Sequence, residues 1–506
     1  MRKWAPISTL TRTTWSKLPR PRRVRWPRAP LRNYSKGRPP CSGRNNPVRP
    51  ANGSVRWIGC LGPFSFGGPK SSTVSRSATA RHAAAIFFPQ RPGLRLTSQG
   101  YSPSVLEKVV RSSARQASFD EAAEALADLA EVTISGRHVG RIAAELGQHF
   151  EAERDHQVQQ FLAHQLKPEV ETRPALAVVG VDGGRLQIRD EGDGPGAHNG
   201  SWREDKVAVL ATAAVTTSES DPEPDLPVCF RDRNYVEKLV RGIGGQSAMS
   251  PSDPQLESPA VTLPMVTDKE DRPRKPPELL VRTYVASTRP SDEFGPMVAA
   301  EAQRRNFNSA AHKVFLGDGA AWIWKLQHLH FPNFQAVVDF LHVLGHLFAA
   351  AKAAEAETAK RWALFQAWAE ACWRGQVGQL IEELGVLRDQ LRPVQEGEAQ
   401  QLADDDPRKI LGEELGYLER NQGRMDYPSY RQRGLPWTSS HVESTVKLFN
   451  RRVKGSEKFW GATGAEAILQ VQAAFLSEDD RLRRHLKTRP CTPYRSYKTR
   501  EDRQAA

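Results

Sequence analysis

Three short motifs carry acidic residues whose types and positions could do chemistry together. Asp182 lies in Val-Val-Gly-Val-Asp-Gly-Gly (178–184) and Asp318 in Phe-Leu-Gly-Asp-Gly-Ala (315–320), and each follows an apolar run typical of a strand. Glu443 ends Ser-Ser-His-Val-Glu (439–443), in the first turn of a predicted amphipathic helix. Two aspartates on strands and a glutamate on a helix can hold a pair of hard cations, which clamp the attacking and leaving oxygens of a phosphodiester.

Two Mg²⁺ (or Mn²⁺) ions are therefore the expected cofactors. Mg²⁺ prefers carboxylate and water oxygens, so Asp and Glu are the residue types that such a site requires. A carboxylate that bridges two ions needs a rigid support, because small misplacements cost rate. The predicted strand gives Asp182 that support, and Gly183 and Gly184 leave room beside it for a nucleic-acid backbone.

Each acid also has a purely structural explanation. Asp-Gly is a common turn dipeptide, and Ser440 with Glu443 has the spacing of a helix capping box. The order of the three acids at the ends of elements favours a shared site. The last helix should dock on a core through a face made of Val442, Val446, Phe449 and Val453. This docking leaves Glu443 at the edge of the helix and exposes three residues to a phosphate backbone, Lys447, Asn450 and Arg451.

A second polar cluster is Asp339-x-x-His342, with His346 one helical turn further on. This spacing can bind metal, but histidines among apolar residues are more often hydrogen-bonded in a core. We favour a role in supporting the acids or handling substrate. Trp437, just before the last acid, should act on flipped or unpaired bases or simply pack.

The net charge of +14 comes entirely from the first hundred residues. Residues 1–100 hold 20 Lys and Arg, 13 Pro and no acid, which leaves 52 basic and 58 acidic residues for the rest. This composition predicts a disordered tail. The tail could add sequence-independent DNA affinity, it has the Arg-rich composition of an organelle transit peptide, or it has no specific function.

Residues 101–170 predict helices near 121–130 and 136–146, the second ended by Gly147. Two short helices across a tight turn suggest a helix-turn-helix, with Arg137, His138 and Arg141 on the reading helix. A helical hairpin that packs on the next domain is the alternative.

The rest of the chain predicts an α/β domain with a long helical insertion. We expect a strand, Gly turn and strand over 176–189, strands at 206–215, 279–287 and 313–317, a loop over 217–278, a helix near 294–305, and a short apolar run at 336–341. Residues 346–435 should be helical, and a basic tail should follow from 481. Five scattered cysteines without a C-x-x-C pair argue against a disulfide framework or zinc ribbon, and no apolar run is long enough to span a membrane. A cytoplasmic protein is expected.

With these motifs in hand, the chain resembles bacterial insertion-sequence transposases of the Mutator-like DDE superfamily, closest to the Kra group. The resemblance covers about residues 101–481. Its motifs are Val-Asp-Gly-Gly-Arg (181–185), Trp-Arg-Glu-Asp-Lys-Val (202–207), Gly-Asp-Gly-Ala-Ala-Trp-Ile-Trp (317–324), Val-Asp-Phe-Leu-His (338–342) and Ser-Ser-His-Val-Glu-Ser (439–444).

The resemblance implies a ribonuclease-H-like core over 171–345 and 436–480, interrupted by the helical insertion. It makes Asp182, Asp318 and Glu443 the catalytic metal ligands and places Asp339 and His342 near them. The implied activity is cleavage and strand transfer at terminal inverted repeats of double-stranded DNA, by a homo-oligomer near the bacterial nucleoid. The alternatives are a transposon-derived DNA-binding protein without chemistry, and a ribonuclease or resolvase on the same fold. The cysteine-rich finger expected near the N-terminus is missing, since Cys41 and Cys60 cannot supply four ligands.

Overall fold

The computed structural model describes residues 56–61, 74–79, 85–87, 95–97, 100–189, 201–247, 277–391, 402–455, 458–489 and 494–496. Most of the predicted basic tail therefore lies outside the described residues. Within it, the strands β1 (Arg56–Leu61), β2 (Val74–Thr79) and β3 (Ala85–Phe87) join β10 (Tyr494–Ser496) in a four-stranded antiparallel sheet. These three segments form strands within the tail that the sequence predicts to be disordered.

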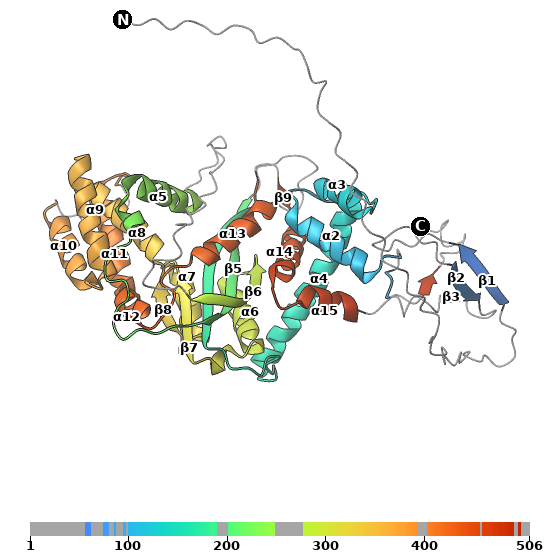
Figure 1. Cartoon of the computed structure of the whole chain (residues 1–506). Coiled ribbons are helices and arrows are strands. Elements are labelled where there is room, and N and C mark those ends of the chain that lie inside the picture. Colours follow the sequence, from blue (N-terminus) through green and yellow to red (C-terminus); the bar gives the residue numbers. More distant parts are fainter. Residues whose placement is uncertain are drawn as a thin grey trace, which may run out of the picture. The chain divides into compact units, whose positions relative to one another are not determined.

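The central element is a mixed sheet in the order β6-β5-β4-β7-β8 (Figure 1). β4 (Leu176–Ile188) pairs antiparallel with β5 (Ser201–Ala214), and β5 pairs antiparallel with β6 (Glu278–Ser287). On its other side, β4 runs parallel to β7 (His312–Gly317), which runs parallel to β8 (Gln335–Val338). The short β9 (Phe459–Trp460) pairs with the far end of β4.

The predicted turn at Gly183 and Gly184 is wrong, because β4 continues through both glycines. They pair with Lys206 and Asp205 of β5 without a break. Gly184 is needed for a close approach instead: a Cβ there would lie 2.7 Å from Asp205 Oδ1 and 3.0 Å from Asn450 Oδ1. The strand thus carries Asp182 on an unbroken ladder.

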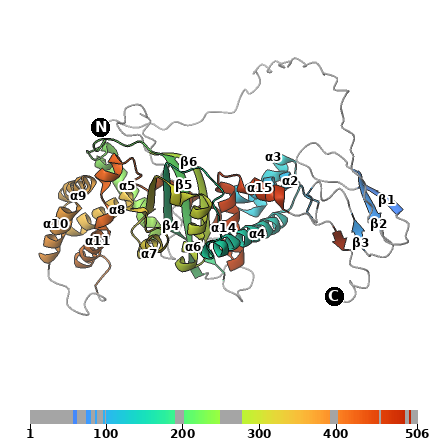
Figure 2. The same cartoon turned by 90° about the horizontal axis from the view of Figure 1, so that it is seen from below.

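Helices cover both faces of this sheet. α6 (Ser291–Arg304) and α7 (Ala321–His330) lie against the sheet (Figure 2). They bury Phe294, Met297 and Ile323 in the core that includes Val179 and Val181 of β4. α13 (Ser440–Val453) and α14 (Ala462–Leu476) cover the other face. The four residues predicted to dock α13, Val442, Val446, Phe449 and Val453, are all fully buried, which confirms that prediction.

The predicted helical insertion consists of α8 (Phe340–Ala354), α9 (Thr358–Trp373), α10 (Val377–Asp389), α11 (Pro407–Asn421) and α12 (Tyr427–Gln432). The predicted loop over 217–278 also contains a helix, α5 (Arg233–Ser247), after the short turn of 3₁₀-helix η1 (Val228–Arg231). α5 packs against α8 and buries Val236 and Leu239. Tertiary packing therefore stabilises a helix that local composition did not predict.

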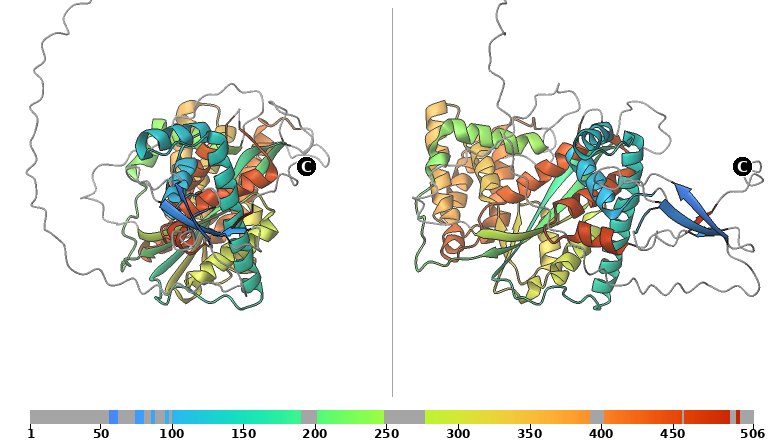
Figure 3. Two further views of the ribbon diagram at one scale, coloured as in Figure 1. Left: turned by 90° about the vertical axis from the view of Figure 1, so that its right-hand side faces the viewer. Right: turned by 45° about the vertical axis from the view of Figure 1, so that its right-hand side comes forward.

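Within residues 100–175, which the structure describes in full, the chain forms α2 (Pro103–Arg115), α3 (Phe119–Ala130) and α4 (Gly136–Leu162) before it enters the sheet. The predicted end of the second helix at Gly147 is wrong, because α4 runs on for four more turns. A Cβ at Gly147 would lie 2.2 Å from the carbonyl oxygen of Ala467, so this glycine lets α4 and α14 run side by side in close contact (Figure 3). The predicted basic tail likewise begins with a helix, α15 (Arg481–Thr488). Among the described residues, no helix is long and apolar enough to cross a membrane.

Candidate active site

The sheet places three aspartates in one row at the end of its parallel strands. Gly180 of β4 pairs with Leu316 of β7, so Asp182 and Asp318, the residue that follows β7, lie at the same end of these two strands. Gly317 pairs with Val338 of β8, so Asp339 is level with Asp318 in turn. Residues at matching positions of parallel strands face the same side, and adjacent strands lie about 4.8 Å apart. The row therefore brings together two of the predicted metal ligands and the Asp of Asp-x-x-His.

Asp182 is a buried acid, and only one of its two carboxylate oxygens has a hydrogen-bond partner. Its side chain is on the face that α13 covers, and the residue is only 9% exposed. Oδ1 accepts a hydrogen bond from the Gly183 amide at 2.7 Å, whereas Oδ2 has no partner. Burial, and secondly the negative charge of Asp318, raise the pKa of Asp182 to about 7. A cation placed between Asp182 and Asp318 would relieve both effects.

Asp339 is fully buried, but both of its carboxylate oxygens accept hydrogen bonds. Its Oδ2 receives hydrogen bonds from Ser439 Oγ at 2.6 Å and from the ring of His342 through Nδ1 at 3.0 Å, and its Oδ1 caps α8 at the Leu341 amide. Burial alone would raise the pKa of Asp339, but the His342 hydrogen bond and charge, followed by Ser439, lower it below its usual value. Asp339 thus acts as a fixed anion that orients His342, whose charge is in turn felt at Asp182.

The first turn of α13 is held against this row from two sides. Ser439 precedes the helix and binds Asp339, while Val442 packs so closely on β4 that a Cβ at Gly180 would lie 2.3 Å from its methyl group. The helix begins at Ser440 with Ser439 as its N-cap, and the Ser439 side chain makes no capping bond. Glu443 is therefore the fourth helical residue, one position beyond the third, where a capping box has its acid. The side chain of Glu443 lies outside the described residues.

The carboxylate oxygens that the structure describes at this site are suitable ligands for a divalent cation. Asp182 and Asp318 supply two carboxylates, and the unpartnered Oδ2 of Asp182 is an acceptor without a donor. Within the described side chains, no group of three His, Cys, Asp or Glu residues is arranged to hold a metal. Asp339 is engaged by His342 and Ser439.

Sequence reasoning missed one buried acid on the same face. Asp205 of β5 pairs with Gly184, is fully buried and has no hydrogen-bond partner at either carboxylate oxygen. Burial raises its pKa to about 6. Asn450 of α13, predicted to contact DNA, instead reaches this spot, and its Oδ1 is also buried without a partner. The alternation of β5 could have revealed Asp205, because it shares a face with Val207 and Val209.

The remaining predicted site residues divide between the protein interior and its surface. His346 stacks on Tyr417 with ring centroids 3.5 Å apart, and its Nδ1 is 2.5 Å from Glu414 Oε2. Trp437 packs edge-on against the rings of Phe340 and Trp373, in line with the packing alternative. Lys447 and Arg451 are exposed on α13, in line with the surface predicted there.

The predicted reading helix is the first part of α4. Arg137 and Arg141 are exposed, and Arg141 donates to His138 Nδ1 at 2.9 Å. Burial and the Arg141 charge lower the pKa of His138, so this histidine is a neutral acceptor. The buried face of α4 contacts α14 and α6, as the helical-hairpin alternative expects.

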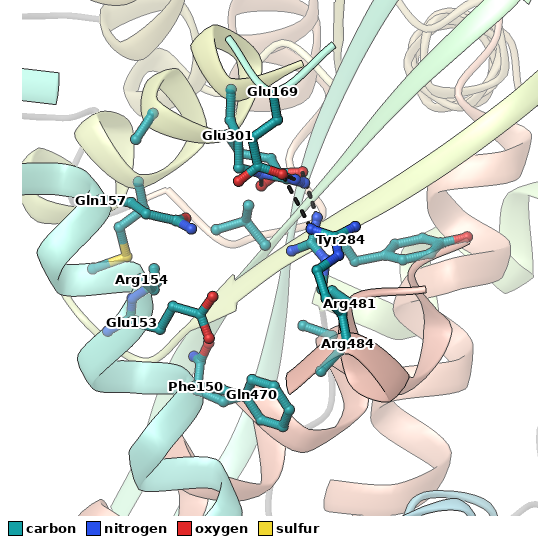
Figure 4. A pocket seen from close by; sticks show the side chains of 16 residues that line it. Phe150, Glu153, Arg154, Gln157, Glu169, Tyr284, Glu301, Gln470, Arg481 and Arg484 are labelled. Carbon is teal, nitrogen blue, oxygen red and sulfur yellow. Dashed lines mark hydrogen bonds and ion pairs between the residues drawn. The ribbon is translucent and has the colours of Figure 1, made fainter. Parts of the chain in front are cut away.

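A different group of polar residues, away from Asp339 and His342 in the sequence, lines a cavity of about 70 Å³ between α4, α6 and α15 (Figure 4). Arg304 donates to Glu301, Asp479 and Glu169, and Arg481 donates to Glu301 and Asp479. Burial would raise the pKa of Glu301, but Arg481 and Arg304 lower it to about 2. These charges satisfy one another, so they join α6 to α15 and to the segments that carry Glu169 and Asp479.

Asp182, Asp318 and Asp339, which we call the acid row, thus form the candidate active site. Comparisons with known proteins give no further guide: no protein-family model matches the chain, and no curated protein matches it significantly.

Proposed function

We propose that this chain is a DDE-type DNA transposase with a ribonuclease-H-like core, which cuts double-stranded DNA at terminal inverted repeats and joins the freed 3′-hydroxyl to a target. The observation that carries the proposal is that Asp182 of β4 and Asp318, the residue after β7, lie near each other at the same end of two parallel strands, with the first turn of α13 packed on β4. The strand order β6-β5-β4-β7-β8, in which β5 alone runs antiparallel to the other four strands, supports the core assignment.

The site residues suit metal-assisted phosphoryl transfer. Asp182, Asp318 and Glu443 would hold two Mg²⁺ ions, which stabilise charge on the phosphorus and lower the pKa of the nucleophile. In cleavage, a water oxygen forms a bond to phosphorus and the 3′-oxygen leaves with a proton. In strand transfer, the oxygen of that 3′-hydroxyl forms a bond to phosphorus of a target phosphodiester and loses its proton, while the bond from phosphorus to the target's own 3′-oxygen breaks and that oxygen leaves as a hydroxyl. Asp339 and Ser439 keep His342 and α13 in place beside the acids.

The test uses the full chain and a plasmid that carries the gene with its native flanking DNA. We expect Mg²⁺-dependent nicking at matched inverted repeats by the wild-type protein. Asp182→Asn, Asp318→Asn and Glu443→Gln should each lower the rate at least about 10³-fold and leave DNA binding nearly unchanged, because they remove metal ligands and not the DNA surface.

Glu382→Gln is the matched control, since it removes one exposed negative charge on α10, away from the acid row. It should cleave like the wild type. Substantial cleavage by Asp182→Asn would reject the site assignment. Specific binding of the flanking DNA without any nicking in Mg²⁺ or Mn²⁺ would favour a DNA-binding protein that lacks chemistry.

A further inference from the structure

The loop that carries Asp318 is held from outside the sheet. The Oδ1 of Asp318 accepts from the Ala320 amide at 2.8 Å, which closes a tight turn after β7. The carbonyl oxygen of the same residue accepts a hydrogen bond from the hydroxyl of Tyr417 at 2.8 Å. Tyr417 belongs to α11, about 100 residues away within the helical region. One side chain of that region therefore fixes the peptide group of a predicted metal ligand.

The loop also fits the ring of Tyr417 closely. Gly319 has a φ of +108°, which L-residues rarely adopt, and a Cβ there would lie 2.4 Å from the Tyr417 ring. Glycine is needed at this position for both reasons. The ring and the loop are thus in direct contact, and any shift of α11 would be transmitted to Asp318.

Tyr417 is also held in place by a second contact, with His346. His346 of α8 stacks on the ring at 3.5 Å with an angle of 20°, and Glu414, one turn before Tyr417, binds His346 Nδ1. Burial, and secondly the charges of Asp318 and Asp339, raise the pKa of Tyr417 well above its usual value, so the hydroxyl remains a donor at any working pH. The ring is therefore held by contacts with both the Gly319 loop and His346.

We propose that Tyr417 is a positioning residue for Asp318, through which the helical region sets the geometry of the acid row. The proposal rests on the proposed function, because Asp318 is a metal ligand only there. It assigns α11 and the His346–Glu414 pair a part in metal binding and rate, in addition to fold stability. A misplacement of about 1 Å can cost a rate of about 100-fold.

Tyr417→Phe tests the proposal, because it removes the hydroxyl and keeps the stacked ring. Tyr430→Phe is the matched control: its hydroxyl donates to the Ala336 carbonyl at 3.3 Å, in the same region but three residues before the nearest acid. We expect Tyr417→Phe to lower kcat for nicking about 10- to 100-fold and to raise the Mg²⁺ concentration for half-maximal rate, with unchanged DNA affinity. Tyr430→Phe should behave like the wild type.

A second readout separates this proposal from the proposed function. Mn²⁺ binding, measured by calorimetry on the full chain, should be several-fold weaker in Tyr417→Phe than in Tyr430→Phe, whether or not any DNA is cut. Equal rates and equal Mn²⁺ affinities in the two variants would overturn the positioning role. If Tyr417→Phe does not fold, Glu414→Gln disturbs the same contacts through His346, and unchanged Mn²⁺ affinity there would overturn it. A wild-type protein that binds Mn²⁺ but never cleaves defeats only the proposed function, and one that binds no Mn²⁺ defeats both.

Discussion

At the scale of single residues, the buried Asp182 makes stability depend on pH. Its pKa is about 7 in the folded protein and about 4 in an unfolded chain. Between these values the folded state binds a proton that the unfolded state does not, so this group lowers stability as pH rises from about 4 to 7. Above pH 7 the full penalty is present, at most about 4 kcal/mol, unless a cation neutralises the carboxylate.

We therefore expect Asp182→Asn to be more stable than the wild type at pH 8 in EDTA, by up to about 4 kcal/mol, and nearly equal to it at pH 4. Urea unfolding at both pH values measures the difference. Mg²⁺ should stabilise the wild type at pH 8 and have little effect on the variant. A gap between the two proteins that is the same at both pH values would show that Asp182 does not titrate in this range.

Among single residues, local pattern predicts some of the site and cannot predict the rest. Asp182 and Asp318 could be found because each follows an apolar strand and is flanked by glycine. Ser439 and Tyr417 could not, because their partners, Asp339 and the Asp318 carbonyl, are about 100 residues away in the chain. Such contacts depend on the register of the sheet and the packing of α11, which no short motif records.

At the scale of helices and strands, the role of a glycine can also depend on packing that the local sequence does not predict. Strands β4 and β7 were predictable, since β-branched and apolar residues dominate both. Gly147 was interpreted as a helix end, but its role is to admit the backbone of α14 at Ala467. Helix α5 was missed because its two buried residues, Val236 and Leu239, lie in a stretch rich in Pro, Ser and Asp, and only packing on α8 makes them a core.

Gly147→Ala tests this interpretation of the α4–α14 contact. An alanine in a helix normally adds up to about 1 kcal/mol of stability relative to glycine. Here the new Cβ would meet backbone atoms of Ala467, so we expect a loss of about 1–3 kcal/mol in denaturant unfolding. Gly385→Ala in α10 is the matched control, because a Cβ there meets nothing within 4 Å, and it should be stabilising. If both variants gain stability, α4 and α14 are less closely packed than described.

At the scale of the whole folded unit, helices α2, α3 and α4 share a hydrophobic core with α13, the helix that carries Glu443. Arg452 of α13 is buried, donates through Nε to the Ser113 carbonyl of α2 at 2.7 Å, and lies over the ring of Phe119 of α3. Burial lowers its pKa to about 10, so it remains charged at neutral pH. The helices 103–162 thus support α13, whether or not they also contact DNA.

Arg137→Ala and Arg141→Ala decide whether these helices also bind DNA. Both side chains are exposed on α4 and outside the core shared with α13, so their removal should leave folding and the rate at saturating DNA unchanged. If they contact phosphates, each variant should weaken binding to the flanking inverted repeats and reduce the slope of log affinity against log salt by about 1. Arg388→Ala, an exposed arginine of α10 paired with Asp389, is the control and should leave the slope as it is. Wild-type affinity and slope in the double variant Arg137→Ala/Arg141→Ala would limit α2 to α4 to the structural role that Arg452 reveals.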